Sequence, residues 1–166
     1  MNKKERASII LKELNKLYPN PPIPLEHKNA FTLLVAVVLS AQSTDKKVNE
    51  LTKDLFMIAD TPSKMVKLGI SNIYKYIRHL GLSKQKSKNT YLLSKMIIDT
   101  FNNKVPNTFE GLESLPGVGH KTASVIMSQV FKIPSFPVDT HIHRLSQRWG
   151  LTKGENVLQT EKDLKK

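Results

Sequence analysis

Two charged residues, each next to a turn or a linker, have side chains that could take part in a reaction. Lys121 lies in LPGVGHKTA (115–123), a glycine-containing turn that opens a helix, and Asp139 lies in VDTHIHRL (138–145), after a proline-containing linker. A neutral lysine amine can attack an electrophilic carbon and form an imine. An ionised carboxylate can stabilise positive charge that develops nearby. Residues of these two types could therefore carry out covalent chemistry through an amine, assisted by a carboxylate.

The turn before Lys121 has a second possible use. An ordinary lysine is neutral in only about one molecule in a thousand near physiological pH. The first turn of a helix and partial burial, both of which we expect for Lys121, favour the neutral amine. However, a helix start with unpaired backbone N–H groups also binds phosphate. Gly117 and Gly119 suit that use, because glycine tolerates positive φ and lets the backbone approach a ligand. From the turn and lysine alone, phosphate binding is the favoured role.

Asp139 also has a simple structural explanation. It lies between a linker and an expected helix, where aspartate is a preferred N-cap residue. The two roles are compatible, because a carboxylate fixed by backbone N–H groups stays ionised and can still stabilise positive charge.

The composition is equally compatible with a nucleic-acid partner and with a generally basic protein, and it excludes several kinds of site. Lys and Arg number 26 against 14 Asp and Glu, a net charge of +12 that attracts polyanions. No cysteine is present, which excludes disulfides, thiolate metal sites and cysteine nucleophiles. The N-terminus lacks a signal-peptide core, and the apolar run Ala30–Leu39 is too short to span a membrane. We therefore expect a cytoplasmic protein with no membrane partner and no metal ligands.

Helical periodicity dominates the chain, and no segment has a convincing strand pattern. Ala30–Leu39 is apolar on all sides, as in a helix at the centre of a domain. Gly81 is expected to end a helix over 71–80 in the left-handed conformation. The pattern predicts an all-α orthogonal array, with helices at about 4–18, 30–39, 45–59, 61–68, 71–80, 84–102, 109–114, 120–131 and 139–149, and one starting at 155.

LPGVGHKTA and VDTHIHRL, preceded by LSAQSTD (39–45), resemble the helix–hairpin–helix DNA glycosylases, specifically the endonuclease III branch. The resemblance is colinear over essentially the whole chain. It implies a six-helix domain over residues 22–134 that contains the helix–hairpin–helix motif at 109–131. Residues 1–21 and 135–166 would together form an incomplete second helical domain.

The resemblance also implies an activity. Such proteins are bifunctional DNA glycosylases and AP lyases of base excision repair, and this branch removes oxidised pyrimidines from damaged double-stranded DNA. We therefore expect a nucleoid-associated monomer. Lys121 matches the family's nucleophile, and Asp139 matches its essential carboxylate. Gln42 and Leu82 match residues that fill the gap left by the extruded nucleotide. The other DNA-binding residues implied by the motifs are Leu115, Gly117, Val118, Gly119, His120, Thr122 and His141.

The chain departs from the family pattern at its C-terminal end. Endonuclease III-like chains normally continue with more helix and with four cysteines that hold a [4Fe–4S] cluster, whereas this sequence reaches Lys166 without one. We therefore expect a truncated chain or a fragment, with no cofactor within these residues and the cluster ligands beyond Lys166.

Two alternatives remain. The chain could be a catalytically weak or inactive DNA-binding module that truncation has left behind. It could also be a sister glycosylase with a different base specificity. Adenine-mismatch and thymine-mismatch relatives generally lack a lysine at the position of Lys121, which argues against those two specificities.

Overall fold

The computed structural model describes residues 1–166, and it is entirely helical. Ten helices and no strand are present, so the prediction of an all-α fold is confirmed. The chain divides into two compact units. The central unit comprises Pro24–Ser135, and the terminal unit comprises Met1–Ile23 together with Phe136–Lys166. No helix combines the length and the apolar character that crossing a membrane requires.

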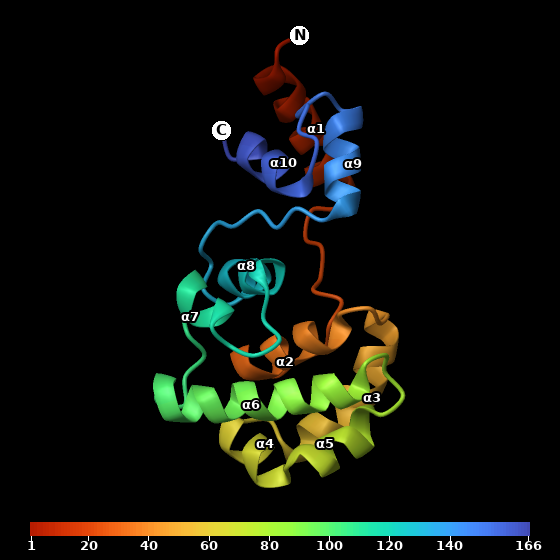
Figure 1. The fold of residues 1–166 in the computed structure, drawn as a ribbon. Coiled ribbons are helices and arrows are strands. Elements are labelled where there is room, and N and C mark those ends of the chain that lie inside the picture. The colour runs from red at the N-terminus through yellow and green to blue at the C-terminus, as the bar shows by residue number, and fades with distance from the viewer. The chain divides into compact units, whose positions relative to one another are not determined.

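The central unit is built around its longest helix, α6. In Figure 1, α6 lies between α2 on one side and the short helices α4 and α5 on the other, and it contacts all three. The unit has seven helices, one for each of the seven ranges that periodicity predicts between residues 30 and 131, whereas the resemblance implies six. Their bounds are α2 Ala30–Ser40, α3 Asp45–Ile58, α4 Pro62–Leu68, α5 Ile70–Ile77, α6 Ser83–Phe101, α7 Phe109–Glu113 and α8 His120–Gln129.

Helix α2 forms the middle of the hydrophobic core. Eight of its 11 residues are buried, because α3, α6 and α8 all pack against it. Burying one large apolar side chain contributes roughly 1.5–3 kcal/mol, so a helix buried on all sides is a strong anchor. Its start is fixed by a capping box between Asn29 and Thr32. Since α8 packs directly on α2, the core sets the position of the helix that carries Lys121.

The terminal unit contains three helices and little apolar core. These are α1 Lys3–Leu17, α9 Thr140–Arg148 and α10 Val157–Leu164, and α1 has no buried residue. Polar contacts join its segments: the His143 ring lies 2.7 Å from the Thr160 hydroxyl, and the Arg6 guanidinium donates to the Gly150 carbonyl at 3.1 Å. Trp149 would be buried if it packed in a core, but 37% of its surface is exposed.

This difference in burial predicts unequal local stability. In hydrogen–deuterium exchange of the native chain, we expect the amides of α1 to exchange well before those of α2. The reason is that α1 buries none of its side chains, whereas α2 is enclosed. Mass spectrometry of peptic peptides measures the two rates in one sample. Equal protection of α1 and α2 would contradict the prediction.

Candidate functional site

Helices α7 and α8 form a hairpin in the central unit. Leu112 and Leu115 bury their side chains at its base, and the Val118 N–H closes the turn on the Leu115 carbonyl at 3.1 Å. Gly117 adopts φ +81°, a conformation that favours glycine. A Cβ atom there would also lie 2.9 Å from Nδ2 of Asn89 on α6. Gly117 is therefore required both by its dihedral angle and by its close contact with α6.

Gly119 serves a different purpose from Gly117. Its backbone is extended, with φ −94° and ψ 179°, so the expectation of a positive φ is correct for Gly117 alone. A Cβ atom at Gly119 would meet no other atom within 4 Å. As the N-cap of α8, Gly119 also supplies no side-chain hydrogen bond to the first turn. The missing side chain therefore leaves space for a ligand in front of the helix start, where backbone N–H groups favour anions.

The other predicted hairpin residues divide between core and surface. Leu115 and Val118 are 2% and 7% exposed, so their side chains belong to the core and only their backbone can meet a ligand. Thr122 is half-buried. His120 is exposed; its ring stacks on Phe109 with centroids 5.4 Å apart, and Nδ1 lies 2.7 Å from a Glu113 carboxylate oxygen. These contacts tie the first residue of α8 to α7.

Lys121 is the second residue of α8, in the first helical turn as the sequence predicts. Its side chain is exposed, however, so the expected partial burial is wrong for this structure. It follows directly on the open backbone of Gly119 and His120. An amine in this position can reach a ligand whose phosphate is bound at the same helix start.

Asp139 is the N-cap of α9, in the terminal unit. Its carboxylate accepts a hydrogen bond from the Ile142 N–H at 2.8 Å, and the side chain is half-buried. The structural part of the expectation, a capping aspartate, is confirmed. His141 lies on the same first turn and is exposed. The cap holds the carboxylate in a fixed orientation at the helix start.

Gln42 and Leu82 lie on two loops that the fold brings together. A Cβ atom at Gly81 would lie 3.6 Å from the carbonyl oxygen of Gln42, an ordinary contact distance, so the two loops lie close together. Both residues are exposed and both are left-handed, with φ +55° and +58°. The prediction that Gly81 takes the left-handed conformation is wrong, because Leu82 takes it as the N-cap of α6. Gly81 is instead the residue before α6 that lies close to the Gln42 loop.

The sequence analysis missed Lys86, which lies one turn into α6. Only 4% of its surface is exposed, and its ammonium donates to the Ser43 hydroxyl at 2.9 Å. Desolvation by this burial lowers the pKa of Lys86. The sequence indicates the burial of Lys86 only through its helical spacing. Lys86 precedes Thr90, Leu93 and Ile97 by four, seven and eleven residues, and all of them are buried.

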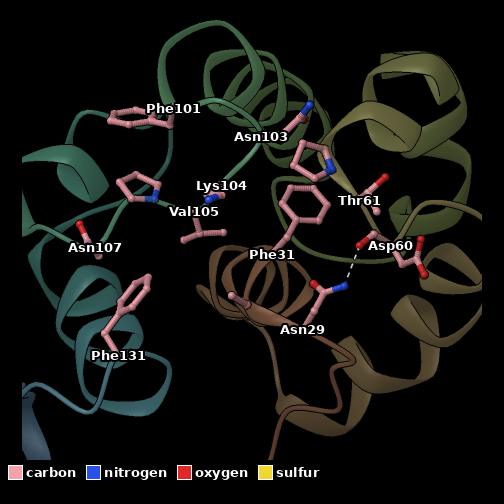
Figure 2. Close-up of a pocket in the computed structure, with 13 residues that line it drawn as sticks. Asn29, Phe31, Asp60, Thr61, Phe101, Asn103, Lys104, Val105, Asn107 and Phe131 are labelled. Atoms are coloured by element: carbon pink, nitrogen blue, oxygen red, sulfur yellow. Dashed lines mark hydrogen bonds between the residues drawn. The ribbon is translucent and has the colours of Figure 1, made fainter.

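A separate groove of about 610 Å³ lies elsewhere in the central unit. Figure 2 shows Phe31 among its lining side chains, beside the hydrogen bond from Asn29 to the Asp60 carbonyl, which is 2.9 Å long. Phe131, beyond the C-terminal end of α8, also lines it. None of the predicted site residues does, so the groove is distinct from the hairpin.

The residues present do not fit an iron–sulfur cluster. Such a cluster is held by four thiolates, and the chain has no cysteine. No group of three or more His, Asp or Glu side chains is placed to hold a metal ion either.

Comparison with known proteins places these features in a family. Residues 35–166 match the model of the HhH-GPD superfamily of base excision DNA repair proteins. Endonuclease III of Rickettsia conorii is 46% identical over 155 residues, which are 93% of this chain and 74% of that protein. Endonuclease III of Escherichia coli K12 is 40% identical over 166 residues, which are 100% of this chain and 78% of that protein.

Solved structures agree with these relatives. A trapped endonuclease III–DNA covalent intermediate matches with a TM-score of 0.90 and 41% identity, covering 99% of this chain and 77% of the other. A thermostable thymine-DNA glycosylase shares the fold at a TM-score of 0.84 with 18% identity, covering 98% and 78% of the two chains. The chain therefore belongs to the endonuclease III family of the HhH-GPD superfamily, as its hairpin and helix array indicate.

Proposed function

We propose that this base excision repair enzyme, a DNA glycosylase with AP lyase activity, removes oxidised pyrimidines through an imine on Lys121. The observation that carries the proposal is the position of Lys121 in the first turn of α8, directly after the open helix start at Gly119. A phosphate bound by that helix start brings a nucleotide sugar within reach of the amine. The electrophile is then C1′ of the damaged nucleotide.

The reaction uses one amine for two bond cleavages. The Lys121 amine attacks C1′, and the base leaves with the bonding electron pair and takes up a proton. Opening of the sugar ring gives the imine, which acidifies the C2′ proton. A general base removes that proton, and β-elimination then breaks the bond between C3′ and its phosphate oxygen. Water then hydrolyses the imine and restores the free lysine.

Asp139 is assigned the carboxylate role in this scheme. As the base leaves, the sugar develops positive charge, and an ionised carboxylate stabilises such a transition state. The hydrogen bond from Ile142 N–H keeps the group oriented, which reduces reorganisation during the reaction. The proposal assigns Asp139 charge stabilisation. Whether Asp139 also takes part in proton transfer can be measured by comparing base release with elimination.

Binding to double-stranded DNA accounts for the other features of the chain. The net charge of +12 attracts the phosphate backbone, and the start of α8 contacts one phosphate without reading sequence. Gln42 and Leu82 enter the space that the extruded nucleotide leaves, which offsets part of the unstacking cost. We expect the enzyme to act as a monomer associated with the nucleoid.

A relative supports the covalent step. The solved endonuclease III complex that is 41% identical to this chain is described as a trapped covalent intermediate with DNA. A covalent protein–DNA intermediate requires a nucleophile on the protein. In this chain Lys121 is the candidate that stands at the hairpin.

Replacing Lys121 with alanine tests the nucleophile. Lys121→Ala is expected to abolish borohydride trapping of the imine and strand cleavage, while duplex binding stays within about threefold. Lys67→Ala removes an exposed lysine from α4 and is the matched control. Gel analysis of trapped and cleaved oligonucleotides measures both activities. Substantial trapped product from Lys121→Ala would exclude this lysine, and no trapping by the unaltered chain would favour an inactive DNA-binding module.

Asp139→Asn separates charge from capping. Asparagine caps helices about as well as aspartate, so we expect the melting temperature to change little. Base release should fall by about a hundredfold or more, because the charge that stabilises the transition state is lost. Single-turnover assays should compare base release with elimination at a preformed abasic site, and the larger loss is expected in base release. Release at the unaltered rate would leave Asp139 only its capping role.

The two hairpin glycines should respond differently to alanine. Gly119→Ala adds a methyl group in open space, so we expect unchanged thermal stability but weaker binding to damaged and undamaged duplexes alike. Gly117→Ala should lower the melting temperature, because alanine pays about 1–2 kcal/mol in the left-handed region and would also meet Asn89. Calorimetry and fluorescence anisotropy measure the two effects. Unaltered DNA affinity of Gly119→Ala would contradict a phosphate site at this helix start.

A further inference from the structure

Lys86 connects the two loops that carry Gln42 and Leu82. Its backbone N–H donates to the Leu82 carbonyl at 2.9 Å, and its ammonium donates to the Ser43 hydroxyl at 2.9 Å. Ser43 directly follows Gln42, and the Ser43 N–H is bonded to Ser40 at the end of α2 at 3.0 Å. The first bond belongs to the first turn of α6, which Leu82 caps, so the side chain of Lys86 links the start of this helix to the Gln42 loop.

A buried cation at this position is costly and needs an explanation. Lys86 is 4% exposed, and no carboxylate forms an ion pair with it. Its compensation comes from the Ser43 hydroxyl and from the nearby C-terminal end of α2, where the helix dipole favours positive charge. Burying a charge with so few partners is unfavourable, and an apolar side chain of similar length usually packs at least as well. Stability alone therefore does not account for a lysine here.

The backbone of the two loops shows what the lysine holds in place. Gln42 and Leu82 are non-glycine residues with φ of +55° and +58°. Such conformations are strained and persist only where surrounding contacts impose them. The hydrogen bond from the Lys86 ammonium to Ser43 is a contact of that kind, and the Gln42 carbonyl also lies close to Gly81. Without the Ser43 bond, the Gln42 loop is free to relax relative to the start of α6.

We propose that Lys86 is a positioning residue that fixes Gln42 and Leu82 relative to one another, so that both side chains enter the DNA stack as one rigid unit. The inference rests on the proposed function, in which these two residues replace the extruded nucleotide. Lys86 itself touches neither the DNA nor the reacting atoms in this scheme. Its contribution is to keep two strained loops in register before the DNA arrives.

The test removes the charge of Lys86 and keeps a side chain of similar length. Lys86→Met removes the ammonium from a chain of similar length, Ser43→Ala removes its partner, and the double variant measures their coupling. Lys95→Met is the matched control, because Lys95 is an exposed lysine on the same helix. The first readout is the fluorescence of 2-aminopurine next to a tetrahydrofuran abasic-site analogue in duplex DNA, which reports unstacking. The second is borohydride trapping on an abasic site in duplex and in single-stranded DNA.

The expected result separates positioning from folding. Lys86→Met should lower the fluorescence change and the duplex trapping rate by about tenfold, since small misplacements are expensive in rate. Trapping on single-stranded DNA should stay within about twofold, because no stack has to be opened there. The melting temperature should not fall. Ser43→Ala should act in the same direction, the double variant should be no worse than Lys86→Met, and Lys95→Met should behave like the unaltered enzyme.

Other results would overturn the proposal. Unaltered fluorescence and duplex trapping in Lys86→Met would show that the two loops keep their register without the lysine. Equal losses on duplex and single-stranded DNA, with a lower melting temperature, would show that Lys86 only supports the fold. If the unaltered chain trapped no imine while 2-aminopurine fluorescence still depended on Lys86, the proposed function would fail and the positioning role would stand.

Discussion

The central unit depends on the packing of the first half of α6 against two other segments, the loop after α2 and the hairpin. Leu82 starts the helix, Lys86 bonds the loop after α2, and Asn89 lies against Gly117 in the hairpin. Gln85 donates to Asn89 at 2.9 Å and steadies the side chain on which the hairpin rests. A displacement of α6 would therefore move the two loops and the hairpin together. Such coupling suits a protein that must bind DNA at several points in a fixed geometry.

The two charged groups of the proposed chemistry are held by the same local device. Lys121 lies in the first turn of α8, and Asp139 is the N-cap of α9. A helix start fixes the direction of a side chain because the backbone of the first turn is ordered by the hydrogen bonds that follow it. Each unit thus supplies one charged group from a helix start, and neither group needs its own dedicated pocket.

The sequence was informative wherever a local pattern determines structure. The apolar run in α2, the cap of α9 and the glycine turn at 115–119 could be located because each obeys short-range rules. The roles of the two loops could not be read in the same way. Gly81 was expected to be left-handed, but the neighbouring Leu82 adopts that conformation, at a place where the chain lies close to a residue 39 positions away, Gln42.

Burial of polar residues was the other point at which prediction from sequence failed. Lysine is the residue type least expected in a core, so Lys86 carried no signal except its spacing to apolar positions further along α6. Lys121 was expected to be partly buried, yet it is exposed. The burial of Lys86 depends on Ser43, which is distant in the chain, and composition holds no information about that contact.

The open start of α8 has a consequence for how DNA affinity varies between conditions and between sequences. The groups offered there are main-chain amides, which do not titrate in the physiological range and are identical whatever side chains surround them. Affinity from this contact should therefore stay constant between acidic and neutral solutions. It should also differ little between duplexes of different sequence, because main-chain amides at an open helix start meet a phosphate and no base, and the missing side chain of Gly119 keeps that start open.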